Sequence, residues 1–381
     1  MRRERLAPGL VRLPEDVSRK EPVDPAFYER KTQIGSGSYG TVFKAQRDGK
    51  MFAIKTHKNM NNYAGDQIRY RLMNEIIMLA SGVILGKSEC PYVIKLKDWY
   101  EKNEQFGLIM DYHRTDLHQV LSKCSFTEEE TAFFLAEIVL AIEAVHSAGV
   151  IHNDIKPENI LIDNAGHAIL TDFGIAEIGA DKKYGRYGTP VYMSPESLKI
   201  CGHDRQADWW SFGVMMYEML AGYLPFEGRS SADLIRSQRK KLHFPGHMSK
   251  DAVDLLQRIL NRNPLKRLST NVDKVKSHPF FASIDWKKLE RGELESPLAR
   301  MTDISNAAHA ISADKRKRRE DSSMFVRMKL FFKAKKRFVQ SAPASPQRRK
   351  CKLRQSRFSL RSLVPRFSTG NSTNQKSGCN V

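Results

Sequence analysis

The chain has 381 residues, of which 41% are hydrophobic, and its 63 lysines and arginines against 43 aspartates and glutamates give a net charge of +20. This composition suits a folded protein with a sizeable core and excludes fibrous and membrane-spanning classes, since no apolar run reaches the roughly 18 residues that cross a bilayer. The amino-terminal residues lead into no hydrophobic signal core, and the five cysteines lack paired or metal-ligand spacing. We therefore expect an intracellular location, cytoplasmic or nuclear.

The positive charge is concentrated towards the carboxyl terminus. Residues 287–381 carry 24 lysines and arginines against seven aspartates and glutamates, whereas the rest of the chain carries 39 against 36. We expect residues 1–27 to form a flexible leader and residues 282–381 a basic, largely disordered tail. The charge of the tail favours acidic partners such as nucleic acid, anionic lipid or an acidic protein.

A glycine-rich segment joins the first two predicted strands. It reads G-S-G-S-Y-G-T-V and contains Gly35, Ser36, Gly37, Ser38, Tyr39, Gly40 and Val42. A lone G-x-G-x-x-G pattern also occurs at ordinary flexible hairpin tips. Here a strand follows the glycines, which argues against a dinucleotide-binding fold and favours a flap over nucleotide phosphates. Glycines suit such a flap because the backbone amides can approach the phosphates without obstruction from Cβ.

The next strand, predicted over residues 51–55, ends with Lys55. Residues 69–80 have helical periodicity and carry Glu75. Taken singly, these are a surface lysine and an ordinary helix glutamate, but their spacing allows an ion pair that would direct the lysine towards phosphates.

Two more strands are predicted over residues 92–97 and 106–110, which completes a small sheet of about five. The remaining globular part is mainly helical. Its clearest helix covers residues 131–148, with a capping box from Thr127 to Glu130, and further helices are predicted over residues 208–222 and 251–260.

The most informative stretch covers residues 151–174. It places Asp154, Lys156 and Asn159 on a short loop and returns to a second acid, Asp172. A carboxylate that accepts a hydroxyl proton, a cation, and an amide with a carboxylate that share a divalent metal form a set of groups suited to phosphoryl transfer.

Two apolar runs, residues 160–162 and 168–170, lie between these groups. The turn over residues 163–167 predicts that they form a β-hairpin. This hairpin would bring Asn159 and Asp172 close together.

Five motifs in this chain together resemble the signature set of protein kinases. They are G-S-G-S-Y-G-T-V at 35–42, F-A-I-K at 52–55, H-N-D-I-K-P-E-N at 152–159, D-F-G at 172–174 and S-P-E at 194–196. The resemblance covers residues 28–281 and implies an α+β, bilobal kinase fold with a small β-rich lobe, a larger helical lobe and ATP between them.

The resemblance also implies roles for single residues. Asp154 matches the catalytic base, Lys156 the lysine that steadies the γ-phosphate, and Asn159 with Asp172 the ligands of Mg²⁺. Thr189 resembles the threonine that contacts the catalytic aspartate in Ser/Thr kinases, so serine and threonine hydroxyls are the expected substrates.

Lys55 and Glu75 match the activating ion pair of the family. The nucleotide site is expected to include the glycine-rich residues together with Ala53, Met110 beside the adenine, and Asp111 and His113 in the hinge. Two structural groups are also similar to the family: a buried salt bridge between Glu196 and Arg267, and an apolar stack of Leu79, His152 and Phe173.

A finer resemblance is to the AGC group of kinases, which includes the ribosomal-S6-type enzymes. It rests on residues 208–213, 217–222 and 281–286. Such kinases prefer arginine upstream of the target, and Asp116, Glu158 and Glu218 occupy the expected positions of the acids that bind it. The alternative interpretation of these three acids is solvated surface charge.

Two features depart from the family pattern. Asn153 replaces the arginine before the catalytic aspartate, and an amide cannot form charge-assisted, bidentate contacts with a phosphorylated loop. Between Asp172 and Glu196 the only Ser or Thr residues are Thr189 and Ser194. We therefore predict activity independent of Ser/Thr phosphorylation in this loop, which leaves Tyr184 and Tyr187 as candidate sites there. The rival hypothesis is a pseudokinase scaffold.

The tail contains three segments with alternative interpretations. Residues 315–319 resemble a nuclear-import signal or a plain basic run. Residues 324–340 have the anchor spacing of some calmodulin targets, and a basic aromatic stretch of this kind could equally lie on anionic lipid or dock on the rest of the chain. Ser356 and Ser359 follow arginines and are candidate autophosphorylation sites, or simply solvated.

Overall fold

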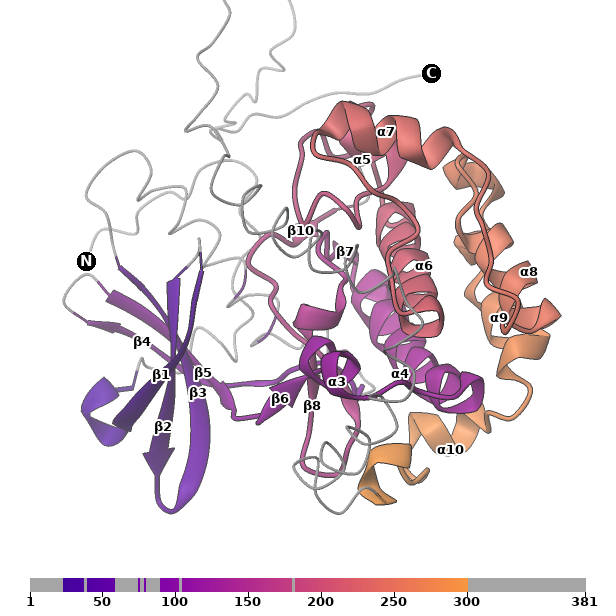
Figure 1. Cartoon of the computed structure of the whole chain (residues 1–381). Helices are drawn as coiled ribbons and strands as arrows, with labels where there is room; N and C mark the ends of the chain where they lie inside the picture. Colours follow the sequence, from indigo (N-terminus) through magenta and orange to yellow (C-terminus); the bar gives the residue numbers. More distant parts are fainter. Residues whose placement is uncertain are drawn as a thin grey trace, which may run out of the picture. The chain divides into compact units, whose positions relative to one another are not determined.

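Five antiparallel strands form the amino-terminal part of the structure (Figure 1). In this computed structural model, residues 23–37, 40–58, 75, 79, 90–102, 105–179 and 182–300 are described. The strands are β1 (Glu29–Gly37), β2 (Gly40–Arg47), β3 (Lys50–Lys58), β4 (Leu96–Lys102) and β5 (Gln105–Asp111), in the order β1-β2-β3-β5-β4. Asp48 and Gly49 join β2 to β3 with φ angles of 50° and 76°, the left-handed pair typical of a tight hairpin.

The prediction of a strand over residues 92–97 is wrong in position, because β4 begins only at Leu96. The apolar residues before it pair elsewhere: the Ile94 amide donates to Leu170, and the Leu170 amide donates to Tyr92, at 2.9 Å each. This run therefore contributes to the core of the helical region. The smaller core of the sheet consists of Tyr28, Ala45, Ile54, Tyr100 and Ile109.

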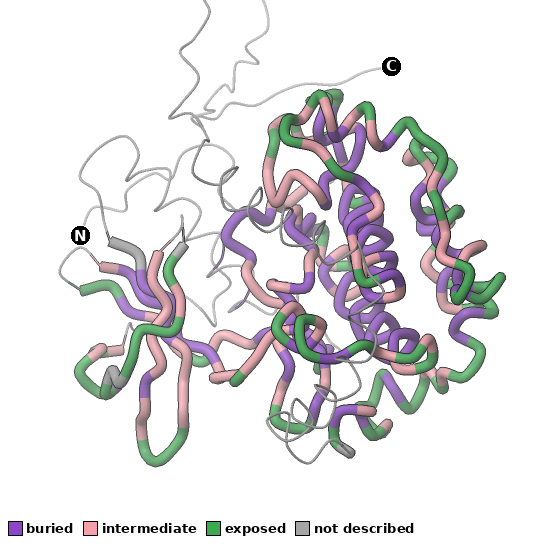
Figure 2. Tube along the Cα trace, viewed as in Figure 1, coloured by how far each residue is buried: buried purple, intermediate pink, exposed green. Residues whose placement is uncertain are grey.

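The helical region surrounds two nearly fully buried helices, α4 (Glu128–Ser147) and α6 (Gln206–Ala221), which are mostly purple in Figure 2. The predicted capping box is confirmed: Thr127 accepts from the Glu130 amide at 3.1 Å, and the Glu130 carboxylate accepts from the Thr127 amide at 2.7 Å. The other α-helices are α3 (Leu117–Lys123), α5 (Pro195–Lys199), α7 (Ser231–Arg239), α8 (Lys250–Ile259), α9 (Val272–Lys276) and α10 (Trp286–Glu290). Six 3-10 helices complete the described part: η1 (Pro25–Phe27), η2 (Pro157–Asn159), η3 (Pro264–Lys266), η4 (Leu268–Thr270), η5 (Pro279–Phe281) and η6 (Pro297–Arg300).

Two small sheets frame the predicted catalytic stretch. Strands β6 (Thr115–Asp116), β8 (Ile160–Ile162) and β9 (Ala168–Leu170) form one, and β7 (Val150–Ile151) pairs with β10 (Glu177–Ile178) in the other. The hairpin predicted between residues 160 and 170 is therefore confirmed.

Buried Glu137 of α4 holds the turn of this hairpin. It accepts from the Ala168 amide at 2.8 Å and bonds Nδ1 of His167 at 2.6 Å. Burial raises the pKa of Glu137 to about 7. The hairpin is thus fixed at its far end to a core helix.

Residues 282–300 continue the folded body beyond the predicted kinase segment. The Tyr92 hydroxyl donates to the Leu289 carbonyl at 2.7 Å, and the Ser296 hydroxyl donates to the Gly166 carbonyl at 2.7 Å. Leu289 and Leu298 are buried. The part of the predicted tail over residues 301–381 lies outside the described residues, as does the leader up to residue 22. Among the described helices, none combines the length and hydropathy needed to cross a membrane.

Candidate active site

Lys55 lies at the meeting point of the sheet and the helical region. On β3 it pairs with Val42 of β2 and Leu108 of β5, and its side chain is buried. Its Nζ donates to both carboxylate oxygens of Glu75, at 2.8 and 3.0 Å, and to Oδ1 of Asp172 at 2.8 Å. The ion pair expected from the spacing of Lys55 and Glu75 is therefore formed.

The charges of these three groups stabilise one another. Burial alone would lower the pKa of Lys55, but the carboxylates of Asp172 and Glu75 raise it above its ordinary value. The Lys55 ammonium holds the pKa of Asp172 well below its usual range, whereas burial raises the pKa of Glu75. Asp172 is therefore anionic at neutral pH, which is the state that a metal ligand requires.

Asp154 is held from three directions. Its Oδ1 accepts from the Thr189 amide at 2.8 Å, and its Oδ2 accepts from Lys156 Nζ at 2.5 Å and from Asn159 Nδ2 at 3.1 Å. Lys156 Nζ also donates to the Thr189 hydroxyl at 2.7 Å. The predicted base, cation and threonine therefore form one hydrogen-bonded group.

Asp208, in the first turn of α6, holds the backbone of the catalytic loop. Its carboxylate accepts from the backbone amides of His152 and Asn153, at 2.8 Å each, and bonds Nε2 of His146 at 2.8 Å. Burial opposes ionisation of Asp208, but the bond from His146 helps to keep the pKa of this carboxyl below its usual value. The motifs predict no role for Asp208, and the available signal in the sequence was an acid at the start of a largely apolar helix.

Asn159 and Asp172 flank the β8–β9 hairpin. The Thr171 amide donates to the Asn159 carbonyl at 3.0 Å, which joins the two segments that carry these side chains. Because Asn159 uses its Nδ2 towards Asp154, its Oδ1 remains as the oxygen suited to a metal. An amide oxygen and a carboxylate fit Mg²⁺, which usually takes only one or two protein ligands and completes its shell with phosphates and water. Among the described residues, no cluster of three His, Cys, Asp or Glu side chains is placed to hold a metal.

The described residues expected at the nucleotide site lie mainly on four strands, β1, β2, β3 and β5. Gly35 pairs with Val42, and Gly37 with Gly40, at the tip of the β1–β2 hairpin. Ala53 of β3 pairs with buried Met110 of β5, and Asp111 ends β5. Ser36 also lies on β1, whereas Ser38 and Tyr39 lie outside the described residues.

His113 of the expected hinge is partly buried, and burial lowers its pKa. Its Nδ1 is enclosed and has no hydrogen-bond partner within the part of the chain that the structure describes. The imidazole is therefore neutral at physiological pH.

The apolar stack is observed in part. The rings of His152 and Phe173 pack edge to face with centroids 4.8 Å apart, and Leu79 and Phe173 are buried in the same core cluster. Burial lowers the pKa of His152, so its ring is neutral. It accepts from the Asp154 amide through Nδ1 at 3.3 Å and bonds the Thr171 carbonyl through Nε2 at 3.0 Å. His152 thus links the metal-ligand segment to the base.

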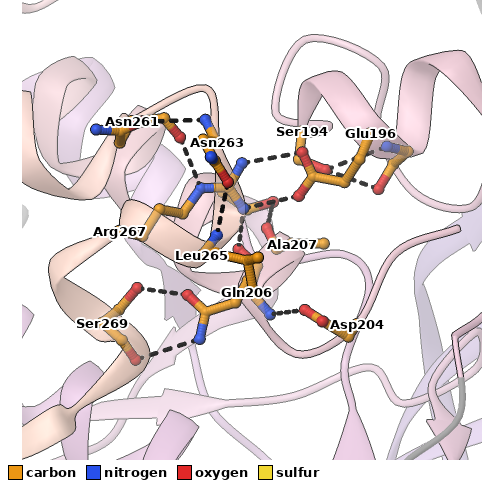
Figure 3. A network of polar contacts seen from close by, with 12 residues as sticks. Ser194, Glu196, Asp204, Gln206, Ala207, Asn261, Asn263, Leu265, Arg267 and Ser269 are labelled. Atoms are coloured by element: carbon orange, nitrogen blue, oxygen red, sulfur yellow. Dashed lines mark hydrogen bonds and ion pairs between the residues drawn. The ribbon is translucent and has the colours of Figure 1, made fainter. Parts of the chain in front are cut away.

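The salt bridge between Glu196 and Arg267 is confirmed and lies in a larger network (Figure 3). The fully buried guanidinium donates to both oxygens of Glu196, at 2.7 and 2.9 Å, and to the Gln206 and Asn261 carbonyls, at 2.7 and 2.9 Å. It also lies over the ring of Trp210, 5.2 Å from the centroid. The network fixes the segment that follows Thr189.

The three acids expected to bind substrate arginine differ in their surroundings. Asp116 caps α3 by accepting from the Gln119 amide at 2.8 Å, which gives this residue a structural role. Glu218 accepts from the Tyr192 hydroxyl at 2.5 Å. Burial raises the pKa of Tyr192, and the nearby charges of Glu218, Glu158 and Asp154 raise it further. Glu158 and Glu218 therefore contribute negative potential at one tyrosine beside the base.

Comparison with known proteins agrees with this geometry. The family model of the protein kinase domain matches residues 28–281. The chain belongs to the protein kinase family. Ribosomal protein S6 kinase alpha-2 is 39% identical in Mus musculus and 40% identical in Homo sapiens, over 291 residues that make up 73% of this chain and 39% of the relative.

Ribosomal protein S6 kinase alpha-6 of Homo sapiens is 38% identical over 289 residues, which make up 73% of this chain and 38% of that protein. The predicted similarity to S6-type kinases of the AGC group, and with it the bilobal α+β kinase fold, is therefore confirmed. This kinase spans less than two fifths of the length of these relatives.

Proposed function

We propose that this kinase transfers the γ-phosphoryl group of ATP to serine and threonine hydroxyls of proteins, with Mg²⁺. The observation that carries the proposal is the bonding of Asp154, whose carboxylate is aimed by Thr189, Lys156 and Asn159. Bound MgATP supplies the phosphoryl group and neutralises charge during transfer.

The site residues have separate roles in the proposed phosphoryl transfer. Asp154 orients the substrate hydroxyl and accepts its proton, and Lys156 places a cation beside the group being transferred. Asn159 and Asp172 would hold Mg²⁺, and Lys55, fixed by Glu75, would contact the phosphates of the nucleotide.

Substrates with arginine upstream of the target are the second part of the proposal. The support is the hydrogen bond from the Tyr192 hydroxyl to Glu218, together with the negative charges of Glu218, Glu158 and Asp154, which all raise the pKa of Tyr192. A guanidinium pairs well with such carboxylates because it presents several donors in a planar fork. Asp116 is left out of this site because it caps α3.

We further propose that activity does not need Ser/Thr phosphorylation in the activation segment, residues 172–196. From the sequence we also propose that the kinase is located in the cytoplasm or the nucleus. The proposed partner of its tail is an acidic or calmodulin-like protein, anionic lipid or an import receptor. The tail residues concerned lie outside the described residues.

The test is transfer of labelled γ-phosphate to an arginine-rich peptide by the full chain and by Asp154→Asn. Removal of the base should lower kcat by on the order of 10²- to 10⁴-fold, while the melting temperature stays close to that of the parent. A parent protein that binds partners but transfers no phosphate would instead support the scaffold hypothesis. A peptide with its arginines replaced tests the substrate preference.

A further inference from the structure

The side chain of Asn153 joins the catalytic loop to the activation segment. Its Nδ2 donates to the Ile175 carbonyl at 3.1 Å and to Oε2 of Glu177 at 3.4 Å, and its Oδ1 accepts from Nε2 of His203 at 3.1 Å. Asn153 has a φ of 69°, in the left-handed region that asparagine enters more readily than most residues. Both ends of the amide are therefore engaged.

The partners of Asn153 hold two different parts of the segment. Glu177 lies on β10 and pairs with Ile151 of β7. Buried His203 exchanges two backbone hydrogen bonds with Lys183, at 2.8 and 2.9 Å. Lys183 also donates its Nζ to the Ile178 carbonyl at 2.9 Å. One amide thus connects β10 with the bridge between Lys183 and His203.

This connection reaches the catalytic base within one residue. The Asn153 amide is fixed by Asp208, and Asp154 follows it in the chain. A Cβ added at Gly188 would lie 2.3 Å from the Asn153 carbonyl oxygen, so the turn before Thr189 packs directly on Asn153. A shift of Asn153 would therefore disturb both Asp154 and the residue that orients it.

In kinases that depend on loop phosphorylation, a new phosphate pairs with arginine and orders the segment. In this kinase the Glu177 carboxylate takes the place of the phosphate, and the Asn153 side-chain amide takes the place of the arginine. We propose that Glu177 and His203 are positioning residues that, through Asn153, order the activation segment without phosphate. This inference deepens the proposed function and rests on it for the activity readout.

A charge-swap cycle tests the contact between Asn153 and Glu177. Glu177→Lys opposes the amide donor with a cation, and Asn153→Asp opposes the carboxylate with another anion, so each should lower kcat roughly tenfold while the KM for ATP changes little. The double variant restores an opposite-charge pair and should return to within about threefold of the parent. Glu227→Lys makes the same charge change at an exposed glutamate between α6 and α7 and serves as the control. If the decreases in kcat of the two single variants multiply in the double variant, the proposal is overturned.

A second pair of variants tests His203. His203→Gln keeps a donor for Asn153 and should retain activity within about twofold, whereas His203→Leu removes it and should lower kcat roughly tenfold. Full activity of His203→Leu would remove His203 from the proposal. This pair changes no charge at Glu177, so it also serves if a charge-swap variant does not fold.

Hydrogen exchange separates this inference from the proposed function, because it needs no catalysis. The Lys183 and His203 amides should exchange faster in Glu177→Lys and Asn153→Asp and slow again in the double variant. If the parent transfers no phosphate, the proposed function fails while the exchange data still decide the ordering. Exchange rates unchanged in both single variants would refute the ordering role.

Discussion

Replacement of Arg267 by methionine provides a direct measure of the network in Figure 3. The guanidinium is fully buried and makes two bonds to Glu196 and two to backbone carbonyls. Methionine fills much of the same volume, so the main cost is the Glu196 carboxylate left in the interior without its partner. Breaking a buried pair in this way costs ~3–5 kcal/mol. We therefore expect Arg267→Met to lower the free energy of unfolding by about that amount.

Urea denaturation followed by tryptophan fluorescence measures this loss, because Trp210 stacks near the guanidinium. Adding Glu196→Gln removes the stranded charge, so the double variant should recover about half of the lost free energy. A loss below ~1 kcal/mol for Arg267→Met, or strictly additive losses in the double variant, would show that the salt bridge is not the source of stability. The m-value should stay unchanged if the denatured state is unaffected.

Two further changes test stability elsewhere. Burial raises the pKa of Glu137 from its ordinary 4.5 to about 7. Protonated Glu137 therefore contributes to the free energy of unfolding fully below pH 4.5, and this contribution is lost as the pH rises through 7. In Glu137→Gln the free energy of unfolding should fall less between about pH 5 and 8 than in the parent, by at most ~3 kcal/mol. Free energies that fall in parallel with pH in the two proteins would contradict this. Ile200 follows the last residue of α5 as its C-cap, with a φ of 56°, and is exposed. Ile200→Gly should therefore raise the melting temperature by about 2–4 °C, and a melting temperature at or below that of the parent would refute the strain.

The chemical groups of the site could be predicted from the sequence better than the residues that hold them in place. Asp154, Asn159 and Asp172 lie within one short stretch whose hairpin is encoded by local turn and strand signals, so their proximity could be predicted. Lys55 and Glu75 could be paired because a strand and the following helix limit where their side chains can meet. Capping signals likewise identified α4 to within a few residues.

The remaining contacts join residues far apart in the chain, and no local pattern encodes them. Asp208 reaches the loop at residues 152–153 from a helix more than fifty residues later. Tyr92 and Ile94 have strand-like composition but pair with β9 rather than with the sheet. Asn153 could be identified as unusual, but its bonds to Glu177 and His203 depend on tertiary packing.

The contact of residues 282–300 with the hairpin has a practical consequence for where the domain can be cut. A truncation after Phe281, where the family match ends, would remove Leu289 from its buried site and leave the Tyr92 hydroxyl without the Leu289 carbonyl. It would also uncover the turn at Gly166, whose backbone approaches Ser296 and Leu298 too closely for a side chain. We therefore expect fragments that stop at the motif boundary to expose an apolar surface and to self-associate, whereas a fragment that extends to residue 300 would keep these contacts.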